Sequence, residues 1–104
     1  MALNNFAGIK DERKCVILGD MLELGEASQA EHQKIADFVE SQAFSDVFLV
    51  GPQFKKTIIG IEKKKFDNAE LLSNYLKTQP MENKFILVKG SRGIHLEKIL
   101  ELLS

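Results

Sequence analysis

A loop near the C-terminus carries the residues of this chain that are best suited to chemistry. It lies in the stretch ILVKGSRGIHLEKIL (residues 86–100), where an apolar run leads into two glycines, a serine and an arginine. Ser91 offers a hydroxyl, and the planar guanidinium of Arg92 can bind a carboxylate or a phosphate through two hydrogen bonds. Gly90 and Gly93 permit positive φ and a close backbone approach. These residue types predict an anion site, and the alternative is a plain strand-to-helix turn with a solvated arginine.

Two neighbours of this loop are secondary candidates. Lys89 ends the apolar run before the loop, and His95 stands at the start of the helix that is expected to follow it. The first amides of such a helix would add donors and a favourable dipole for an anion; a capping or surface role is the alternative for His95. The loop has neither the G-x-x-x-x-G-K-[ST] nor the G-x-G-x-x-G order, so it is neither a P-loop nor a dinucleotide fingerprint.

A second unusual segment, GDMLELGE (19–26), follows the first apolar run. Asp20 stands directly after that run, where an acid either meets a polar ligand or caps a helix. Glu23 adds a second carboxylate. Apolar side chains accompany these acids: Met21, Leu22 and Leu24. They indicate either contact with another domain or a loop that folds back onto its own core.

Simpler interpretations hold for the remaining polar residues. His32 has polar neighbours and is expected to be a solvated imidazole, while Cys15 is expected to be a core thiol. Two separated histidines and one thiol make a poor metal site, so we predict none. A lysine cluster is expected to be a solvated edge that protects a sheet from pairing. Its members are Lys55, Lys56, Lys63, Lys64 and Lys65.

The elements that must position these residues alternate between strand and helix. Continuous apolar runs predict buried strands at 14–19, 46–51 and 84–90, and a short strand at 63–66. Helices are expected after two capping boxes, Ser28 with Glu31 and Asp67 with Glu70. A short helix is expected at 53–60, and a last helix at 94–103. The apolar helix positions are Ile35, Phe38, Val39, Leu72, Tyr75, Leu76, Leu96, Leu100 and Leu103.

This alternation predicts the fold class. Strands that alternate with helices form a mostly parallel, Rossmann-like α/β sheet with helices on both faces, and 104 residues suffice for a single domain. Ligands of such sheets bind at the carboxyl ends of the strands. Three places therefore matter: Gly19–Asp20, Gly51–Pro52 and Lys89–Gly93.

Composition excludes several classes of protein. The net charge is −1, whereas a nucleic-acid binder usually carries a basic surplus. No apolar run approaches the roughly 18 residues of a membrane span, and the N-terminus shows no export signal. The single cysteine suits a reducing compartment. We therefore expect a cytoplasmic domain without nucleic-acid partners.

Both unusual segments also resemble a known family. VILGDMLELGEASQAEHQKIADFV (16–39) and ILVKGSRGIHLEKIL are similar to the C-terminal domain of the Mur ligases. The intervening DVFLVGPQF (46–54) matches as well, so the resemblance covers nearly the whole chain. Within the family, the chain is most similar to the branch that adds D-alanyl-D-alanine to UDP-N-acetylmuramoyl-tripeptide, in cell-wall synthesis.

The resemblance implies a three-domain, ATP-dependent ligase of which residues 1–104 form the C-terminal, acceptor-binding domain. ATP with Mg²⁺ would activate the tripeptide carboxylate, and the dipeptide amine would then attack it. Ser91 and Arg92 fall at the family's acceptor-side loop, while Asp20 and Glu23 fall at its other signature loop and would face the interdomain cleft. The expected partners are both substrates and the enzyme's own N-terminal and central domains.

Departures from the family pattern limit what this chain is expected to do. It has no P-loop, and MALNNFAGI resembles the helix after the family's YNANP-like motif, so that motif is absent. We therefore expect no catalytic residue here, no tight binding of ATP or Mg²⁺, and no catalysis by the isolated chain. The alternative is a stand-alone, non-catalytic module that binds a small anion or a protein partner.

Overall fold

The structure is a computed structural model of the 104-residue chain. It describes residues 3–8, 13–22, 25–42, 44–60, 64–79 and 85–90, and the single residues Ile94, Leu96 and Ile99. The elements in chain order are α1 (Leu3–Ala7), β1 (Lys14–Gly19), η1 (Gly25–Ala27), α2 (Ser28–Ser41), β2 (Asp46–Val50), α3 (Pro52–Lys55), β3 (Lys64–Phe66), α4 (Ala69–Thr78) and β4 (Phe85–Lys89).

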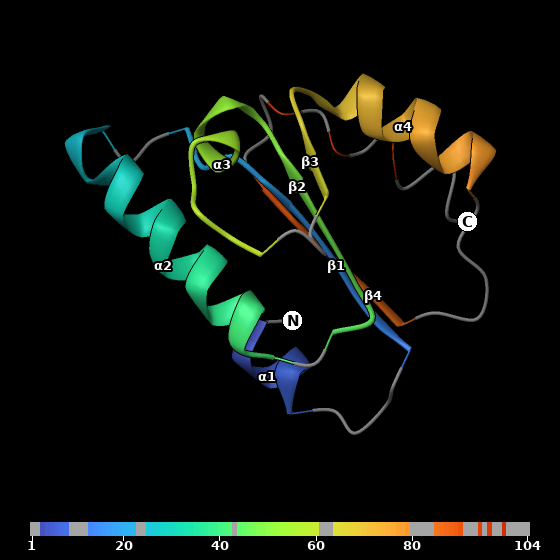
Figure 1. Ribbon diagram of the computed structural model, residues 1–104, viewed down its shortest axis with the longest axis horizontal. Helices are drawn as coiled ribbons and strands as arrows, with labels where there is room; N and C mark the ends of the chain where they lie inside the picture. Colours follow the sequence, from blue (N-terminus) through green and yellow to red (C-terminus); the bar gives the residue numbers. More distant parts are fainter. Residues whose placement is uncertain are drawn as a thin grey trace.

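The described strands form one parallel sheet in the order β3-β2-β1-β4. In the register of the central strand, Ile17 lies opposite Phe48 on one side and Val88 on the other. Helices α1, α2 and α3 lie on one face and α4 on the other (Figure 1). The predicted α/β fold class is therefore confirmed, and the three long strands match their apolar runs to within one residue at each end.

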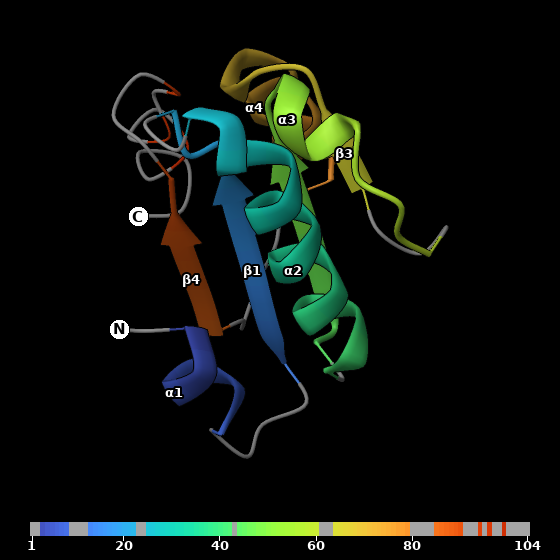
Figure 2. The same ribbon diagram turned by 90° about the vertical axis from the view of Figure 1, so that its left-hand side faces the viewer.

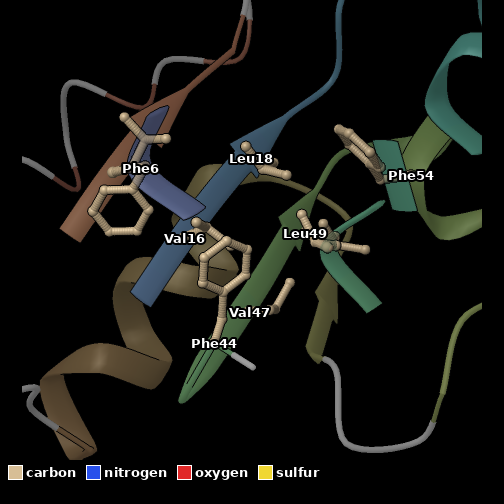
Figure 3. Packing of buried hydrophobic residues seen from close by; sticks show 9 residues of the cluster. Phe6, Val16, Leu18, Phe44, Val47, Leu49 and Phe54 are labelled. Carbon is tan, nitrogen blue, oxygen red and sulfur yellow. The ribbon is translucent and has the colours of Figure 1, made fainter. Parts of the chain in front are cut away.

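Alternation along the strands divides the core into two layers. Val16 and Leu18 point to the face of α1, α2 and α3, where they pack with Phe6 and Phe54 (Figure 3). Cys15 and Ile17 point the other way, against α4 and the buried side chains of Leu96 and Ile99. Every residue of β1 is buried, as expected for a strand covered on both faces.

The amino end of β1 holds α1 in place through a buried lysine. Lys14 is 8% exposed, and its Nζ donates a 2.8 Å hydrogen bond to the carbonyl of Ala7. The same ammonium lies 5.3 Å from the ring centroid of Phe44. A cation at the last turn of a helix satisfies its free carbonyls and opposes its dipole. α1, which the resemblance implied, is thus fixed at its C-terminal end.

Both predicted capping boxes are wrong, for different reasons. The N-cap of α2 is Ala27, without a side-chain cap bond, because the Ser28 hydroxyl contacts the imidazole of His32 instead. The N-cap of α4 is Asn68, whose side chain accepts a 2.9 Å bond from the amide of Leu71. Asp67, one residue earlier, pairs with Lys55 at 2.9 Å.

The shorter elements differ from expectation in extent. α3 ends at Lys55, although a helix was predicted over 53–60, and β3 covers three residues. The apolar positions predicted for α2 and α4 do pack against the two core layers. The helix predicted at 94–103 lies outside the described residues, apart from Ile94, Leu96 and Ile99.

The lysine cluster is only partly a solvated edge. Lys55 and Lys56 are exposed. Lys65 on β3 is half-buried and donates to the Thr57 carbonyl, so it holds the segment after α3. Lys63 and the side chain of Lys64 are not among the described parts of the chain.

None of the helices within the described ranges has the length and apolarity that a membrane crossing requires.

Candidate functional site at the carboxyl ends of β1 and β4

The order of the strands places a crevice between β1 and β4. From β1 the chain passes to β2 and β3 on one side of it, and it returns to β4 on the other. The crossover through α2 covers one face and the crossover through α4 covers the other (Figure 2). In open parallel sheets, the point where strand order reverses is where ligands bind.

Two of the three predicted places meet at this switch point. Leu18 and Lys89 are paired across the β1–β4 ladder, so Gly19–Asp20 and Gly90 follow at adjacent strand ends. Gly51 lies on the far side of β1, because Gly19 pairs with Val50. The sheet therefore brings Gly19 and Asp20 beside Lys89 and Gly90, the described parts of the two unusual sequence segments at these strand ends.

Gly90 is required by a close approach. A Cβ on Gly90 would lie 2.9 Å from the Gly19 Cα and 2.8 Å from Cδ1 of Leu96. A Cβ on Gly19 would lie 2.9 Å from the same Leu96 side chain. The backbone at the ends of β1 and β4 thus comes into close contact, with Leu96 packed over both ends. This contact requires glycine at positions 19 and 90.

Asp20 caps α3. Its carboxylate accepts a 2.8 Å bond from the amide of Gln53 and a 2.9 Å bond from the amide of Phe54, and the side chain is fully buried. These amides belong to the first turn of α3, where donors have no partner within the helix. The structure therefore supports the capping alternative for Asp20, and neither carboxylate oxygen faces solvent.

Gly51 makes room for this cap. It has φ of 117°, a conformation that L side chains rarely adopt. A Cβ at this position would lie 2.4 Å from the Asp20 Cγ. The glycine after β2 is therefore needed twice, for its backbone angle and for the space that the carboxylate occupies.

His32 is buried, and the prediction of a solvated imidazole is wrong. Its side chain is 0% exposed and packs edge-on against Phe54 with ring centroids 4.7 Å apart. Nδ1 lies 2.6 Å from the Ser28 carbonyl, which has no proton to give, so Nδ1 is the donor. Nε2 accepts a 3.0 Å bond from the amide of Met21. The imidazole thus fixes the loop that follows β1.

Ser28, His32 and Asp20 do not form a nucleophilic triad. The Ser28 hydroxyl lies 3.2 Å from Nδ1 of His32, and Asp20 lies 3.9 Å from Nε2. A base must offer a lone pair to the nucleophile, but Nδ1 carries the proton and the Nε2 lone pair is used by the Met21 amide. The group is a structural network that ties α2, α3 and the β1 loop together.

Other predicted site residues are placed as follows. Lys89 is exposed at the end of β4. Met21 is half-buried, and Leu22 is 54% exposed, so this loop turns one apolar side chain inward and the next outward. The remaining predicted residues lie outside the described residues: Glu23, Leu24, Ser91, Arg92, Gly93 and His95.

A groove opens beside the switch point on the face of α1 and α2. We call it the switch groove; its volume is about 570 Å³. Most of its lining is apolar, with two lysines and two strand-end glycines. The lining residues are Leu3, Leu18, Gly19, Met21, Lys34, Ile35, Phe38, Phe54, Lys89 and Gly90.

The part of the chain that the structure describes offers no binding site for Mg²⁺. Those residues contain no group of three His, Cys, Asp or Glu side chains that could hold a metal ion. Both oxygens of Asp20 already accept backbone amides.

Sequence reasoning missed the role of His32, although a signal was present. His32, Ala36 and Val39 recur at four- and three-residue spacing, and all three are buried in α2. That spacing places the histidine on the core face of the helix. The amides of Gln53 and Phe54 had no comparable signal, because the acid that they bind lies more than 30 residues away.

Comparison with known proteins gives one consistent result. The UDP-N-acetylmuramoyl-tripeptide--D-alanyl-D-alanine ligase of Buchnera aphidicola subsp. Acyrthosiphon pisum is 41% identical over 91 residues, which are 85% of this chain and 20% of that protein. The ligase of the same name from Rickettsia prowazekii is 34% identical over 96% of this chain and 23% of its own length. No protein-family model matches the chain.

Solved structures agree with these matches. MurF ligase from Thermotoga maritima in complex with ADP has a TM-score of 0.66 and 25% identity, over 86% of this chain and 21% of that one. MurF from Acinetobacter baumannii has the same TM-score at 22% identity and shares the fold over 88% of this chain and 22% of its own. The chain spans about a fifth of the length of the relatives that it matches.

Proposed function

Because this chain is homologous, over the segment it spans, to the UDP-N-acetylmuramoyl-tripeptide--D-alanyl-D-alanine ligases, we propose that residues 1–104 are the acceptor-binding domain of such a ligase. The observation that carries the proposal is the pairing of Leu18 with Lys89. This pairing supports the proposal because the first residues of GDMLELGE and of KGSRG, the two motifs that carry the resemblance, follow adjacent strand ends. The homology favours this function over a stand-alone anion-binding module.

The proposed reaction makes one amide bond in two steps. A carboxylate oxygen of the tripeptide attacks the γ-phosphorus of ATP, which releases ADP and leaves an acyl phosphate. The amine of D-alanyl-D-alanine then attacks the acyl carbon, phosphate leaves from the tetrahedral intermediate, and the amine loses its proton. The ATP and the UDP-linked tripeptide would be bound mainly by the precursor and central domains, since this chain has no P-loop.

In this scheme the present chain binds and orients the dipeptide. Arg92 would bind its carboxylate through two hydrogen bonds, and Ser91 would donate a third. Lys89, Gly90, Gly93 and His95 would supply or shape the rest of the loop. The loop after the carboxyl end of β4 would then select a zwitterionic acceptor by its carboxylate.

Asp20 takes a positioning role in this proposal. Its oxygens are occupied by α3 amides, so we assign the ammonium of the dipeptide to Glu23, the other acid of the same loop. The His32 bond to the Met21 amide supports the start of that loop. Closure of the domain over the other two would exclude water from the acyl phosphate.

The product places the proposed enzyme in peptidoglycan precursor synthesis, and so in cell-wall biogenesis, cell shape and cell division. We assign it to the cytoplasm, where UDP-linked precursor and ATP would both be available. Its one cysteine, Cys15, is buried, and a single thiol suits a reducing compartment.

The test is Arg92→Lys in the longer enzyme encoded by the complete reading frame. Lysine keeps the charge but loses the planar two-point contact. Because a hydrogen bond to a charged group contributes roughly 1.5–3 kcal/mol, kcat/KM for the dipeptide should fall about tenfold or more. The KM for ATP should change far less. Ser91→Ala should show the same selectivity with a smaller loss, near 1 kcal/mol for a neutral hydroxyl.

Arg13→Lys is the matched control, because Arg13 is an exposed arginine next to the amino end of β1, at the opposite edge of the sheet. It should leave both parameters unchanged. Equal losses for ATP and dipeptide in Arg92→Lys would instead indicate impaired domain closure. Wild-type kinetics of Arg92→Lys would show that the loop is a plain turn that does not bind the dipeptide.

A further inference from the structure

The chain leaves the sheet through two successive backbone amides at the end of β1. The Asp20 amide donates a 2.9 Å hydrogen bond to the Val50 carbonyl of β2, which continues the pairing of β1 with β2. The next amide, that of Met21, donates a 3.0 Å bond to Nε2 of His32 in α2. One residue beyond the bond to β2, the imidazole therefore replaces the neighbouring strand as the partner of this segment.

The imidazole of His32 is itself held in one place and in one tautomer. Its side chain is 0% exposed, and the ring packs edge-on against Phe54. Nδ1 donates a 2.6 Å bond to the Ser28 carbonyl, one turn earlier in the same helix. The Asp20 carboxylate lies 3.9 Å from Nε2, beyond hydrogen-bonding distance. With the proton on Nδ1, the one lone pair of the ring is on Nε2, where the Met21 amide binds.

Met21 connects this support to the switch point. Its side chain is half-buried and lines the switch groove together with Gly19 and Gly90. Figure 2 shows the first turns of α2 beside the carboxyl end of β1. Leu22, the next residue, is 54% exposed, so the loop turns towards solvent directly after the supported amide. The bond to His32 therefore sets the direction in which the loop leaves the sheet.

We propose that His32 is a positioning residue for binding of the acceptor. Its imidazole, protonated on Nδ1, holds the Met21 amide and thereby orients the GDMLELGE loop at the switch point. The imidazole acts through the backbone and touches no substrate. This inference rests on the proposed function, because that proposal assigns the loop to the ammonium of the dipeptide.

The Met21 amide gives this role its leverage. Because Met21 is half-buried, its amide is costly to leave without an acceptor. If Nε2 were removed, the loop would have to turn this amide towards water and would leave its place beside the strand ends. A misplacement of about 1 Å can cost on the order of 100-fold in rate. One backbone hydrogen bond thus suffices to control how the loop meets the acceptor.

The test compares His32→Gln with His32→Asn in the longer enzyme encoded by the complete reading frame. The polar atoms of glutamine stand as many bonds from Cα as Nε2, so its oxygen can accept from the Met21 amide. Those of asparagine correspond to Nδ1, so this side chain can donate to the Ser28 carbonyl but does not reach Met21. Both variants lose the ring and keep a neutral amide, so their difference isolates one hydrogen bond.

His32→Asn should raise the KM for D-alanyl-D-alanine about tenfold, and His32→Gln should raise it less than about threefold. The KM for ATP should change less than about twofold in both variants. A purely structural role would instead lower the folded fraction, which reduces the apparent kcat and leaves KM unchanged. Gln29→Asn is the matched control, since Gln29 is exposed in the first turn of α2, and it should leave all three parameters unchanged.

A second readout needs no substrate. In the 104-residue chain, the Met21 amide should exchange with deuterium at least about tenfold faster in His32→Asn than in wild type or His32→Gln. The ¹⁵N resonances of the wild-type imidazole should show a proton on Nδ1 and none on Nε2. This measurement on the wild type decides the tautomer even if His32→Asn does not fold.

Equal KM values for the dipeptide in the two His32 variants would overturn the inference, and so would a wild-type proton on Nε2. Equal rises in the KM for ATP and for dipeptide would also overturn it, because the imidazole would then serve domain closure. If Arg92→Lys still shows its selective loss in any of these cases, the proposed function stands and only the role of His32 falls. Wild-type kinetics of both Arg92→Lys and His32→Asn would overturn the two together.

Discussion

The Asp20 carboxylate joins two backbone amides that lie 33 and 34 residues further along the chain. Neither oxygen is left for solvent or ligand, since the side chain is fully buried. A carboxylate with two amide donors is stabilised by charge-assisted hydrogen bonds, which are stronger than neutral ones. The acid of the GDMLELGE motif therefore has a structural role: its negative charge holds the first turn of α3 at the end of β1.

Asp20→Asn should therefore destabilise the protein severely for so small a change. An asparagine oxygen can accept from one of the two amides, but its NH2 group then faces the other donor. A lost charged hydrogen bond together with a buried unsatisfied donor costs about 3 kcal/mol. Urea denaturation followed by circular dichroism measures this loss. Asp67→Asn, which breaks an exposed pair with Lys55, should cost less than about 1 kcal/mol.

A loss for Asp20→Asn no larger than that of Asp67→Asn would show that the α3 cap contributes little. The acid would then be free to act as a ligand contact in the longer enzyme, as the sequence alone allowed.

Single residues were predictable where a local pattern determines their environment. Cys15 was correctly predicted as a core thiol because it stands inside an apolar run, and it is 0% exposed. His32 was not, because polar neighbours in sequence are not its neighbours in space. Its environment is set by Met21 and Phe54, from a loop and from α3. The choice between the ligand and capping roles of Asp20 likewise depended on contacts that span more than 30 residues.

At the scale of elements, strands were more predictable than helix ends. A strand buried on both faces leaves a continuous apolar run, and such runs located β1, β2 and β4. Helix starts depend on which of several adjacent polar residues reaches the free amides. Asp67 and Asn68 are both good cap residues. In the structure Asn68 is the N-cap of α4, while Asp67 forms an ion pair with Lys55.

Segments between elements are held by side chains that no local rule identifies. The Gln33 amide of α2 both donates to the Ile58 carbonyl and accepts from the Ile58 amide, at 2.8 and 2.9 Å. Glu40, two turns later, accepts from the Gly60 amide at 3.1 Å. The predicted helix over 53–60 ends early, and these bonds instead hold the backbone of Ile58 and Gly60 against α2.

Asn68→Ala should weaken α4 by about 1 kcal/mol, the usual cost of removing an N-cap. The Leu71 amide would lose its acceptor, and alanine cannot replace it. Asn74→Ala is the matched control, since Asn74 is exposed inside the same helix. Alanine has the higher helix propensity there, so this variant should be neutral or slightly more stable. Chemical denaturation of both variants separates the two effects, and equal stability of the two would exclude Asn68 as the cap.

At the scale of the whole molecule, the parallel sheet brings together two strand ends that are about 70 residues apart in sequence, Gly19–Asp20 and Lys89–Gly90. The predicted fold class implied that these strand ends are close together, because parallel strands place all their carboxyl ends at one edge of the sheet. The identity of the ligand did not follow from the same pattern. Spacing gave only an anion site, and the homology to ligases about five times as long supplied the reaction that the site would serve.

The 104-residue chain should therefore fold without performing the reaction. It has no P-loop to hold the phosphates of ATP, and phosphoryl transfer depends almost entirely on such positioning and on charge stabilisation. With ATP, Mg²⁺, UDP-N-acetylmuramoyl-tripeptide and D-alanyl-D-alanine, phosphate release should equal that of heat-denatured chain. The longer enzyme, assayed in parallel, should release one phosphate for each amide bond. Release by the isolated chain that scales with its concentration and persists after repurification would mean that residues 1–104 contain a phosphate site of their own, and the division of labour between domains proposed above would be wrong.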